Sequence, residues 1–386
     1  MSAVLGVMQP EISMDSIPQY SGKPTLYLDQ NILDLFVKNG MGSFGRKLMD
    51  KFQIVYSDET LKEVRRSTGY ENDFLNIIKD LGSCHLKIVV EQPGFIITDK
   101  ATITSRDVFE AFEEYCSNDN EYGNIENSMN QWLFKFSGGR SGDSISDIHD
   151  EQVAAFSQLM GGMLDNADEL PDEMRGQIKE YSKSMMEQFK STLQEIENTM
   201  SKDIPDTKEW NGIKSYRESV GIGPKELNNI EPPKVIEKIW DTFKARLSEN
   251  DQINSLEDFF QIRINPIYPD RPYHQHQKIA GMYNMLNTIG YFPDSKVHKE
   301  RRFVAAMSDN SHASMASFCN LLLSRDENFV KKVRAVYEYL GVPTEVKLVT
   351  VSNATIRCTR SQLRSTFFVV SLRSFTTKKC STTLAR

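Results

Sequence analysis

Four acidic residues, Asp29, Glu63, Asp309 and Asp326, stand where apolar stretches of the sequence meet polar ones. Taken singly, each has a structural explanation, because carboxylates often cap helices or favour their first turns. If the four lay together, they would repel one another unless a divalent metal ion neutralised them. Oxygen ligands without paired histidines or cysteines select Mg²⁺ or Mn²⁺ over zinc. These residue types therefore indicate a candidate site for a hard cation.

Asp29 has the most informative surroundings of the four. It ends a short apolar run, and an amphipathic helical pattern begins directly after it. Open α/β sheets place ligands at such points, where a buried strand delivers a side chain just before a helix. A helix cap at Asp29 would not explain the polar pair Gln30 and Asn31 that follows it. Asp29 is therefore the first functional candidate.

The elements that would position these acids alternate between strand and helix. Short apolar or β-rich runs predict strands, and apolar residues three or four apart predict helices. Strands are predicted at 25–29, 52–56, 86–91, 321–323 and 346–351, and helices at 30–38, 60–67, 73–81, 275–288, from about 308 and at 328–339. This alternation is typical of a parallel sheet, whose strand ends and following helix starts converge on one edge.

The middle of the chain has a different character, because acidic helical patterns replace the strand signals. One apolar face of a long helix is predicted from Met174, Ile178, Tyr181, Met185, Phe189, Leu193, Ile196 and Met200. We divide the chain into a leader at 1–20, the first half of an α/β domain at 21–92, a helical insertion or subdomain at 93–255, the second half of the α/β domain at 256–351, and a basic Ser/Thr/Arg-rich tail at 352–386. The tail is a flexible segment, a contact arm or a reading-frame artefact.

Four short stretches resemble the motifs of the PIN-like nuclease family. They are residues 26–31, 56–64, 308–313 and 321–329, which read LYLDQN, YSDETLKEV, SDNSHA and LLLSRDENF. The resemblance covers roughly residues 20–92 and 300–350. It implies a three-layer α/β/α domain with a central parallel sheet, here interrupted by the large helical insertion. It also implies an acidic cluster that binds Mg²⁺ or Mn²⁺ and cleaves single-stranded RNA.

The resemblance assigns roles to particular residues. The acidic cluster would consist of Asp29, Glu63, Asp309 and Asp326, with Glu59 as the alternative to Glu63. Metal ions held there would lower the pKa of an attacking water and stabilise the leaving oxygen of a phosphodiester. Contacts to the phosphate or to the metal ligands would come from Asn31, Ser308, Ser324 and Arg325.

The leading hypothesis for function is a cytoplasmic, metal-dependent endoribonuclease, with a toxin or defence role as a further suggestion. One alternative is a non-catalytic PIN-like scaffold or binding protein in which the acids serve as caps. Another is a nuclease of single-stranded or flap DNA, which we rank below an RNA nuclease. The helical insertion would shape substrate access or bind a protein partner, including a second copy of the chain.

Charge and composition narrow these classes. The net charge is −7, but residues 351–386 hold seven basic and no acidic residues, so the rest carries 39 basic against 53 acidic residues, or −14. Contacts of this acidic body with nucleic acid must therefore be local. No apolar run reaches the length of about 18 residues that predicts a membrane span, and the N-terminus lacks a basic signal-peptide region. Five scattered cysteines without paired spacing fit a reducing compartment.

Three histidines are not expected to bind metal. His274 and His276 lie two residues apart with no third ligand nearby, which is not the spacing of a dedicated zinc site. His312 falls one helical turn after Asp309, where it would pack under the site, contact substrate or satisfy a buried hydrogen bond. We expect the last of these.

Overall fold

The computed structural model describes residues 22–91, 96–166, 172–203, 210–246, 253–264, 271–352, 355–359 and 369–371. The predicted leader at 1–20 and most of the predicted tail at 352–386 lie outside these residues. None of the described helices is long and apolar enough to cross a lipid bilayer.

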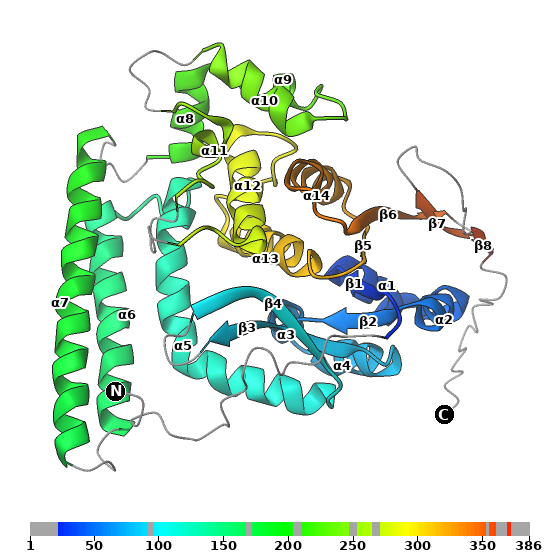
Figure 1. The fold of residues 1–386 in the computed structure, drawn as a ribbon, viewed down its shortest axis with the longest axis horizontal. Coiled ribbons are helices and arrows are strands. Elements are labelled where there is room, and N and C mark those ends of the chain that lie inside the picture. The colour runs from blue at the N-terminus through cyan, green and yellow to red at the C-terminus, as the bar shows by residue number, and fades with distance from the viewer. Residues whose placement is uncertain are drawn as a thin grey trace, which may run out of the picture.

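A mostly parallel sheet forms the centre of the fold (Figure 1). Its strands are β1 (Thr25–Leu28), β2 (Gln53–Tyr56), β3 (Cys84–Glu91), β4 (Ile96–Thr104), β5 (Leu321–Ser324), β6 (Glu345–Ser352), β7 (Thr355–Thr359) and β8 (Val369–Ser371). Within the described residues the order is β4-β3-β2-β1-β5-β6-β7-β8. Pairs among β3, β2, β1, β5 and β6 are parallel, whereas β4, β7 and β8 pair antiparallel toward the edges. The predicted α/β class is confirmed.

Helices surround this sheet and extend away from it. They are α1 (Gln30–Asn39), α2 (Gly42–Lys51), α3 (Asp58–Arg66), α4 (Glu71–Asp80), α5 (Val108–Phe136), α6 (Ile145–Asn166), α7 (Asp172–Asp203), α8 (Gly212–Val220), α9 (Pro224–Leu227), α10 (Val235–Lys244), α11 (Leu256–Phe259), α12 (Gln275–Ile289), α13 (Glu300–Ala316) and α14 (Glu327–Leu340). Most helices predicted in the two α/β halves are present, with ends that differ by at most two residues.

Two features of the elements differ from the sequence predictions. Helix α13 begins at Glu300, not near Ser308, so Asp309 lies in the middle of a helix and not in its first turn. Strand β4 opens the segment that was predicted to be a helical insertion, and β7 and β8 belong to the segment that was predicted to be a tail. These three strands all pair antiparallel, outside the parallel strand–helix alternation on which the prediction rested.

Alternate residues of the central strands contribute to two separate hydrophobic clusters. Leu26 and Leu28 of β1 pack with apolar residues of α1 to α4. Tyr27 and Leu322 belong to the other cluster, which draws on α10 to α14. Because successive side chains of a strand point to opposite faces, this division means that both faces of the sheet are buried.

The strand order reverses at β1. The chain adds β2 and β3 on one side of β1 and later returns to place β5 on the other side. Leu28 lies opposite Leu323 in this pairing, and the backbone N–H of Asp29 donates to the carbonyl of Leu323 at 3.0 Å. Open α/β sheets bind ligands outside the carboxyl ends of the strands at such a switch point.

The long helices α6 and α7 lie side by side at one end of the molecule (Figure 1). Phe156 of α6 stacks on Phe189 of α7 with 4.2 Å between ring centroids, and Leu193 is buried. Tyr181, which was predicted on the same apolar face, is 48% exposed. The buried part of this face is therefore covered by α6.

The sheet core should dominate the stability of the chain. Leu322 is fully buried in β5, so Leu322→Ala is expected to lower the free energy of unfolding by about 2–5 kcal/mol. Leu133→Ala is the matched control, because that leucine is 39% exposed and its loss should cost less than about 1 kcal/mol. Urea denaturation of both variants measures the difference, and equal losses would contradict this placement of the core.

Candidate active site

Asp29 lies buried at the carboxyl end of β1 and is 4% exposed. It occupies the N-cap position of α1 but makes no side-chain capping bond. Its Oδ2 instead accepts hydrogen bonds from the Asn31 amide and the Ser324 hydroxyl, whereas Oδ1 has no hydrogen-bond partner within the described residues. The amide of Asn31 also reaches Ser324 at 3.1 Å. Asn31 and Ser324, both predicted as site residues, thus hold the carboxylate in place.

Asp326 lies two residues after Ser324, at the N-cap of α14. Its Oδ1 accepts from the backbone N–H of Phe329 at 2.9 Å, so it caps the helix as the sequence suggested. Its own backbone N–H donates to the Ser324 hydroxyl at 3.0 Å. Among the described contacts, Oδ2 accepts no hydrogen bond. Capping therefore occupies one oxygen of Asp326 and leaves the other available to a ligand.

Asp309 projects from the middle of α13 and is partly exposed. Its carboxylate makes no hydrogen bond to any residue that the structure describes. Desolvation raises the pKa of Asp309 well above its ordinary value, and the charges of Asp29 and Asp294 raise it further, although Lys332 and His312 oppose them. The charge of Asp29 therefore acts on Asp309, although no hydrogen bond joins the two side chains in the described residues.

The pKa of Asp29 is shifted by burial and by nearby charged groups. Burial is the main reason that its pKa rises to about 6, and the charges of Glu63 and Asp326 act in the same direction. His312 and the hydroxyl of Ser324 act against this shift. We call Asp29, Asp309 and Asp326 the carboxylate cluster, because the charges of Asp326 and Asp309 each interact with that of Asp29 and each of the three keeps an oxygen without a hydrogen-bond partner among the described residues.

Glu63 is bound more completely than the sequence suggested. One oxygen receives the Arg66 guanidinium at 3.3 Å, and the other lies 3.0 Å from Nε2 of His312. Burial alone would raise the pKa of Glu63, but the adjacent His312 and Arg66 outweigh it and lower the pKa. Glu63 therefore lies beside the carboxylate cluster with both oxygens already engaged.

A buried chain of hydrogen bonds continues from Glu63 beneath the site. Nδ1 of His312 lies 2.7 Å from the Tyr27 hydroxyl, which lies 2.7 Å from the hydroxyl of Ser57. His312 is 1% exposed, so the expectation that it satisfies a buried hydrogen bond is confirmed. The chain connects β1, α3 and α13 and so fixes the spacing between Glu63 and the strand that carries Asp29.

Glu59, the alternative to Glu63, lies on the other side of Arg66. Its carboxylate accepts from the Ser308 hydroxyl at 2.6 Å, and the same hydroxyl receives an Arg66 N–H. Glu63 is linked through His312 to Tyr27 of β1, the strand that leads to Asp29, whereas Glu59 is bound to Ser308. Ser308 thus bridges α3 and α13.

The last predicted contact residue, Arg325, is exposed at the turn between β5 and α14. Its backbone N–H donates to Oδ1 of Asn31 at 2.8 Å. Asn31 consequently bridges the two strand ends, with its amide nitrogen on Asp29 and its amide oxygen on the Arg325 backbone. The Arg325 side chain is exposed, so it is accessible to a phosphate.

Sequence reasoning missed three residues beside the cluster. Lys332 of α14 is fully buried and donates to Asp294 and to Asn287, each at 2.7 Å. The Tyr283 hydroxyl is buried without a hydrogen-bond partner among the described residues. Burial is the main reason that its pKa is raised, and the charges of nearby carboxylates raise the pKa further. Asp294, Lys332 and Tyr283 lie in segments with no motif, so only the folded structure reveals them.

A preformed metal cage is not present in the described part of the chain. No set of three or more His, Cys, Asp or Glu side chains converges there closely enough to hold an ion as the side chains stand. The donor chemistry nevertheless suits a hard cation, because the carboxylate cluster offers free oxygens whose negative charges oppose one another.

Comparison with protein-family models, with curated proteins and with solved structures found no match to this chain. The function of the site therefore has to be inferred from its own geometry and charge. The relevant facts are the switch point, the three carboxylates with free oxygens and the buried support beneath them.

The raised pKa of Asp29 predicts that the free energy of unfolding of the metal-free protein depends on pH. Since the folded state holds this proton up to about pH 6 and the ordinary value is 3.8, the contribution of Asp29 to stability falls as pH rises from about 4 to about 6. Asp29→Asn should remove this loss and stabilise the metal-free protein by about 1–3 kcal/mol at pH 7, with little effect near pH 4.

Urea denaturation in a chelating buffer between pH 4 and pH 8 tests this expectation. Asp34→Asn serves as the control, because Asp34 pairs with Lys38 on the surface of α1. A variant Asp29→Asn that is less stable than the wild type at pH 7 would show that the Asp29 carboxylate is stabilising and not under electrostatic strain.

Proposed function

We propose that the protein is a Mg²⁺- or Mn²⁺-dependent endonuclease that hydrolyses phosphodiester bonds of single-stranded RNA. The observation that carries this proposal is the carboxylate cluster at the switch point of the sheet. Asp29 and Asp326 follow the paired strands β1 and β5, Asp309 of α13 interacts with the charge of Asp29, and each acid keeps an oxygen without a hydrogen-bond partner among the described residues. Acids that serve only as helix caps would have no reason to gather around the buried Asp29.

Asp29, Asp309 and Asp326 would hold the metal. A bound ion of this kind supplies Lewis-acid chemistry, activating water and neutralising charge on the phosphate. Asn31 and Ser324 fix the orientation of Asp29 through its Oδ2, which leaves Oδ1 directed to the ligand side. Arg325, exposed beside Asn31, would bind a phosphate oxygen of the substrate.

Glu63 has a supporting task in this proposal. Because His312 and Arg66 already engage its two oxygens, it would orient a water or a ligand through these partners more readily than it would coordinate an ion. The buried chain from Tyr27 through His312 to Glu63 keeps this carboxylate charged and in position. The earlier assignment of Glu63 as a ligand thus becomes a positioning role.

The strand order and the two clusters of buried residues also support a PIN-like, three-layer α/β/α arrangement with a helical insertion. Cys84 and Cys319, which form no disulfide within the described residues, suit action in the cytoplasm. A toxin or defence role would be compatible with an RNA-cleaving activity. A DNA nuclease would use the same cluster, and substrate comparison separates the two.

The activity proposal predicts that two conservative substitutions abolish cleavage. Asp29→Asn and Asp326→Asn should each reduce Mg²⁺- or Mn²⁺-dependent cleavage of single-stranded RNA by more than about a hundredfold, because each removes a ligand charge. Asparagine is also a good N-cap, so Asp326→Asn keeps the bond to Phe329 and tests charge alone. Asp34→Asn should cleave as the wild type does.

The measurement is the cleavage rate of labelled single-stranded RNA and DNA, accompanied by calorimetric titration with Mn²⁺. Full activity in either variant would exclude the assignment. A wild type that binds no Mn²⁺ would favour the scaffold alternative, and preferential cleavage of DNA would favour the DNA nuclease.

The support of Asp29 gives a separate prediction. Asn31→Ala removes the amide that binds Asp29 and bridges to the Arg325 backbone, so cleavage should fall by about 10–100-fold while the chain stays folded. Raising the Mn²⁺ concentration should restore part of this loss, because the defect lies in holding the ligand and not in the ligand itself. Unchanged kinetics across a metal titration would remove Asn31 from the site.

A further inference from the structure

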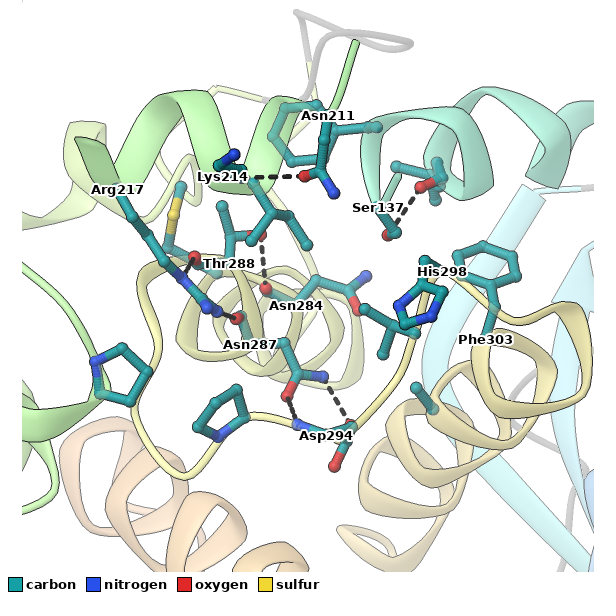
Figure 2. Close-up of a pocket in the computed structure, with 18 of the residues that line it drawn as sticks. Ser137, Asn211, Lys214, Arg217, Asn284, Asn287, Thr288, Asp294, His298 and Phe303 are labelled. Carbon is teal, nitrogen blue, oxygen red and sulfur yellow. Dashed lines mark hydrogen bonds between the residues drawn. The ribbon is translucent and has the colours of Figure 1, made fainter. Parts of the chain in front are cut away.

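A large pocket opens beside α13, the helix that carries Asp309, and none of the three acids of the carboxylate cluster lines it. Its volume is about 960 Å³, and its walls come from α5, α8, α12 and the chain leading into α13. Figure 2 shows side chains of these elements pointing into one space. Two of the walls, α5 and α8, belong to the helical segment between the halves of the sheet. The cluster does not explain why this pocket exists.

One wall of the pocket is aromatic. Trp132 and Phe136 of α5 line it together with Phe303 of α13, whose ring lies 5.0 Å from that of Phe134 of α5 between centroids. Trp210, which is buried behind this wall, stacks on Trp132 with 5.9 Å between ring centroids and meets Phe136 edge-on. The Trp132 ring is therefore held in a fixed orientation, as a stacking surface requires.

Cations lie around the opening. Lys214 and Lys296 line the pocket and are exposed, and Lys296 makes no ion pair within the described residues. Arg217 uses its guanidinium on the carbonyls of Asn287 and Thr288 and has no carboxylate partner there. Its five N–H donors are not exhausted by these two bonds. Phosphate groups would find unneutralised positive charge at this opening.

The two acidic side chains of the lining do not cancel that charge. Asp294 is paired with the buried Lys332 at 2.7 Å. Glu218 lies 3.9 Å from Lys214, an exposed pair of the kind that contributes little. In a chain whose body is acidic, this local excess of cations is the sort of confined contact that nucleic acid would need.

The interior offers a polar group without a partner. Oδ1 of Asn284, on α12, is buried and accepts no hydrogen bond from the described residues. Figure 2 shows the Asn284 amide facing the imidazole of His298 across the cavity. A buried acceptor without a donor is costly, so a ligand that supplies an N–H or O–H would be favoured there. The exocyclic amine of a base or a ribose hydroxyl meets this need.

The pocket and the carboxylate cluster share helix α13. Ala306 and Met307 line the pocket, and Asp309 follows within one turn of the same helix, about 4.5 Å along the axis from Ala306. Asp294 lines the pocket and also perturbs the charge of Asp309. A chain that enters the cluster could thus continue directly into the pocket.

We infer that this pocket is the binding site for the nucleotides of single-stranded RNA next to the cleaved phosphodiester, with a base stacked on Trp132 and phosphates at Lys214 and Lys296. That the RNA runs from the pocket to the carboxylate cluster rests on the proposed nuclease function. The binding surface itself rests only on the residues that line the pocket. The helical segment then supplies substrate recognition, and the sheet supplies the carboxylates.

Binding and cleavage can be measured separately. The probe is a short fluorescein-labelled single-stranded RNA, titrated with full-length protein in Ca²⁺, and fluorescence anisotropy reports the Kd. Trp132→Ala and Lys296→Glu should each raise the Kd by about tenfold or more, because one removes a stacking surface and the other reverses a charge. Tyr70→Ala and Lys47→Glu are the controls, since both side chains are exposed outside the pocket, and they should leave the Kd unchanged.

The outcomes separate the two proposals. If the wild type binds RNA through Trp132 and Lys296 but does not cleave it in Mg²⁺ or Mn²⁺, the pocket assignment stands and the nuclease assignment fails. If the wild type cleaves RNA and the pocket variants bind and cleave as the controls do, the pocket assignment fails and the nuclease assignment stands. Equal affinity for DNA of the same sequence would overturn the assignment of RNA as the ligand.

Discussion

The parallel pairing of β1 with β5 is the constraint on which the site depends. Leu28 and Leu323 face each other in this pairing, and the residues that follow them, Asp29 and Ser324, are joined by a hydrogen bond although 295 positions separate them. The polar residue at each strand end is therefore satisfied by the polar residue at the other. The intervening chain can be long, because the entropy of closing a loop grows only slowly with its length.

This pairing also creates the electrostatic problem that defines the site. Burial at the switch point removes water from Asp29, and its acidic neighbours then raise its pKa in the metal-free protein. Two buried cations lie nearby and offset part of this charge. Lys332 pairs with Asp294, and His312 pairs with Glu63. These pairs neutralise the rim of the cluster but leave its free oxygens uncompensated. A fold under pressure only for stability would replace such acids, so their presence favours a ligand.

The sequence predicted the parts of this arrangement that local patterns encode. Strands β1 and β5, the cap at Asp326 and the position of Asp29 follow from short apolar runs that end in polar residues. The start of α13 was misplaced because Lys299 makes no capping bond, whereas Ser308 and Asp309 resemble a helix start. Ser308 is in fact buried in the helix and bonded to Glu59. The pattern could not separate a cap from a contact between helices.

Other members of the site could not have been found from spacing at all. Tyr27 reads as one apolar residue of a strand between two leucines, yet its hydroxyl contacts His312, 285 positions away. Lys332 reads as a solvated position on α14, yet it is buried against Asp294 and Asn287. Polar groups of this kind take their roles from partners brought by tertiary structure, and a single sequence does not name the partners.

Helix α13 joins the two functional parts of the molecule. Its first turns, with Phe303 and Ala306, line the pocket, and its middle carries Asp309 and His312. Because residues in a helix keep a fixed rise and rotation, the pocket and the carboxylate cluster are held at a fixed spacing. The long helices between the halves of the sheet therefore need not touch the carboxylates to influence them. They shape the space beside one rigid helix, and that helix sets where an RNA chain in the pocket would meet the acids.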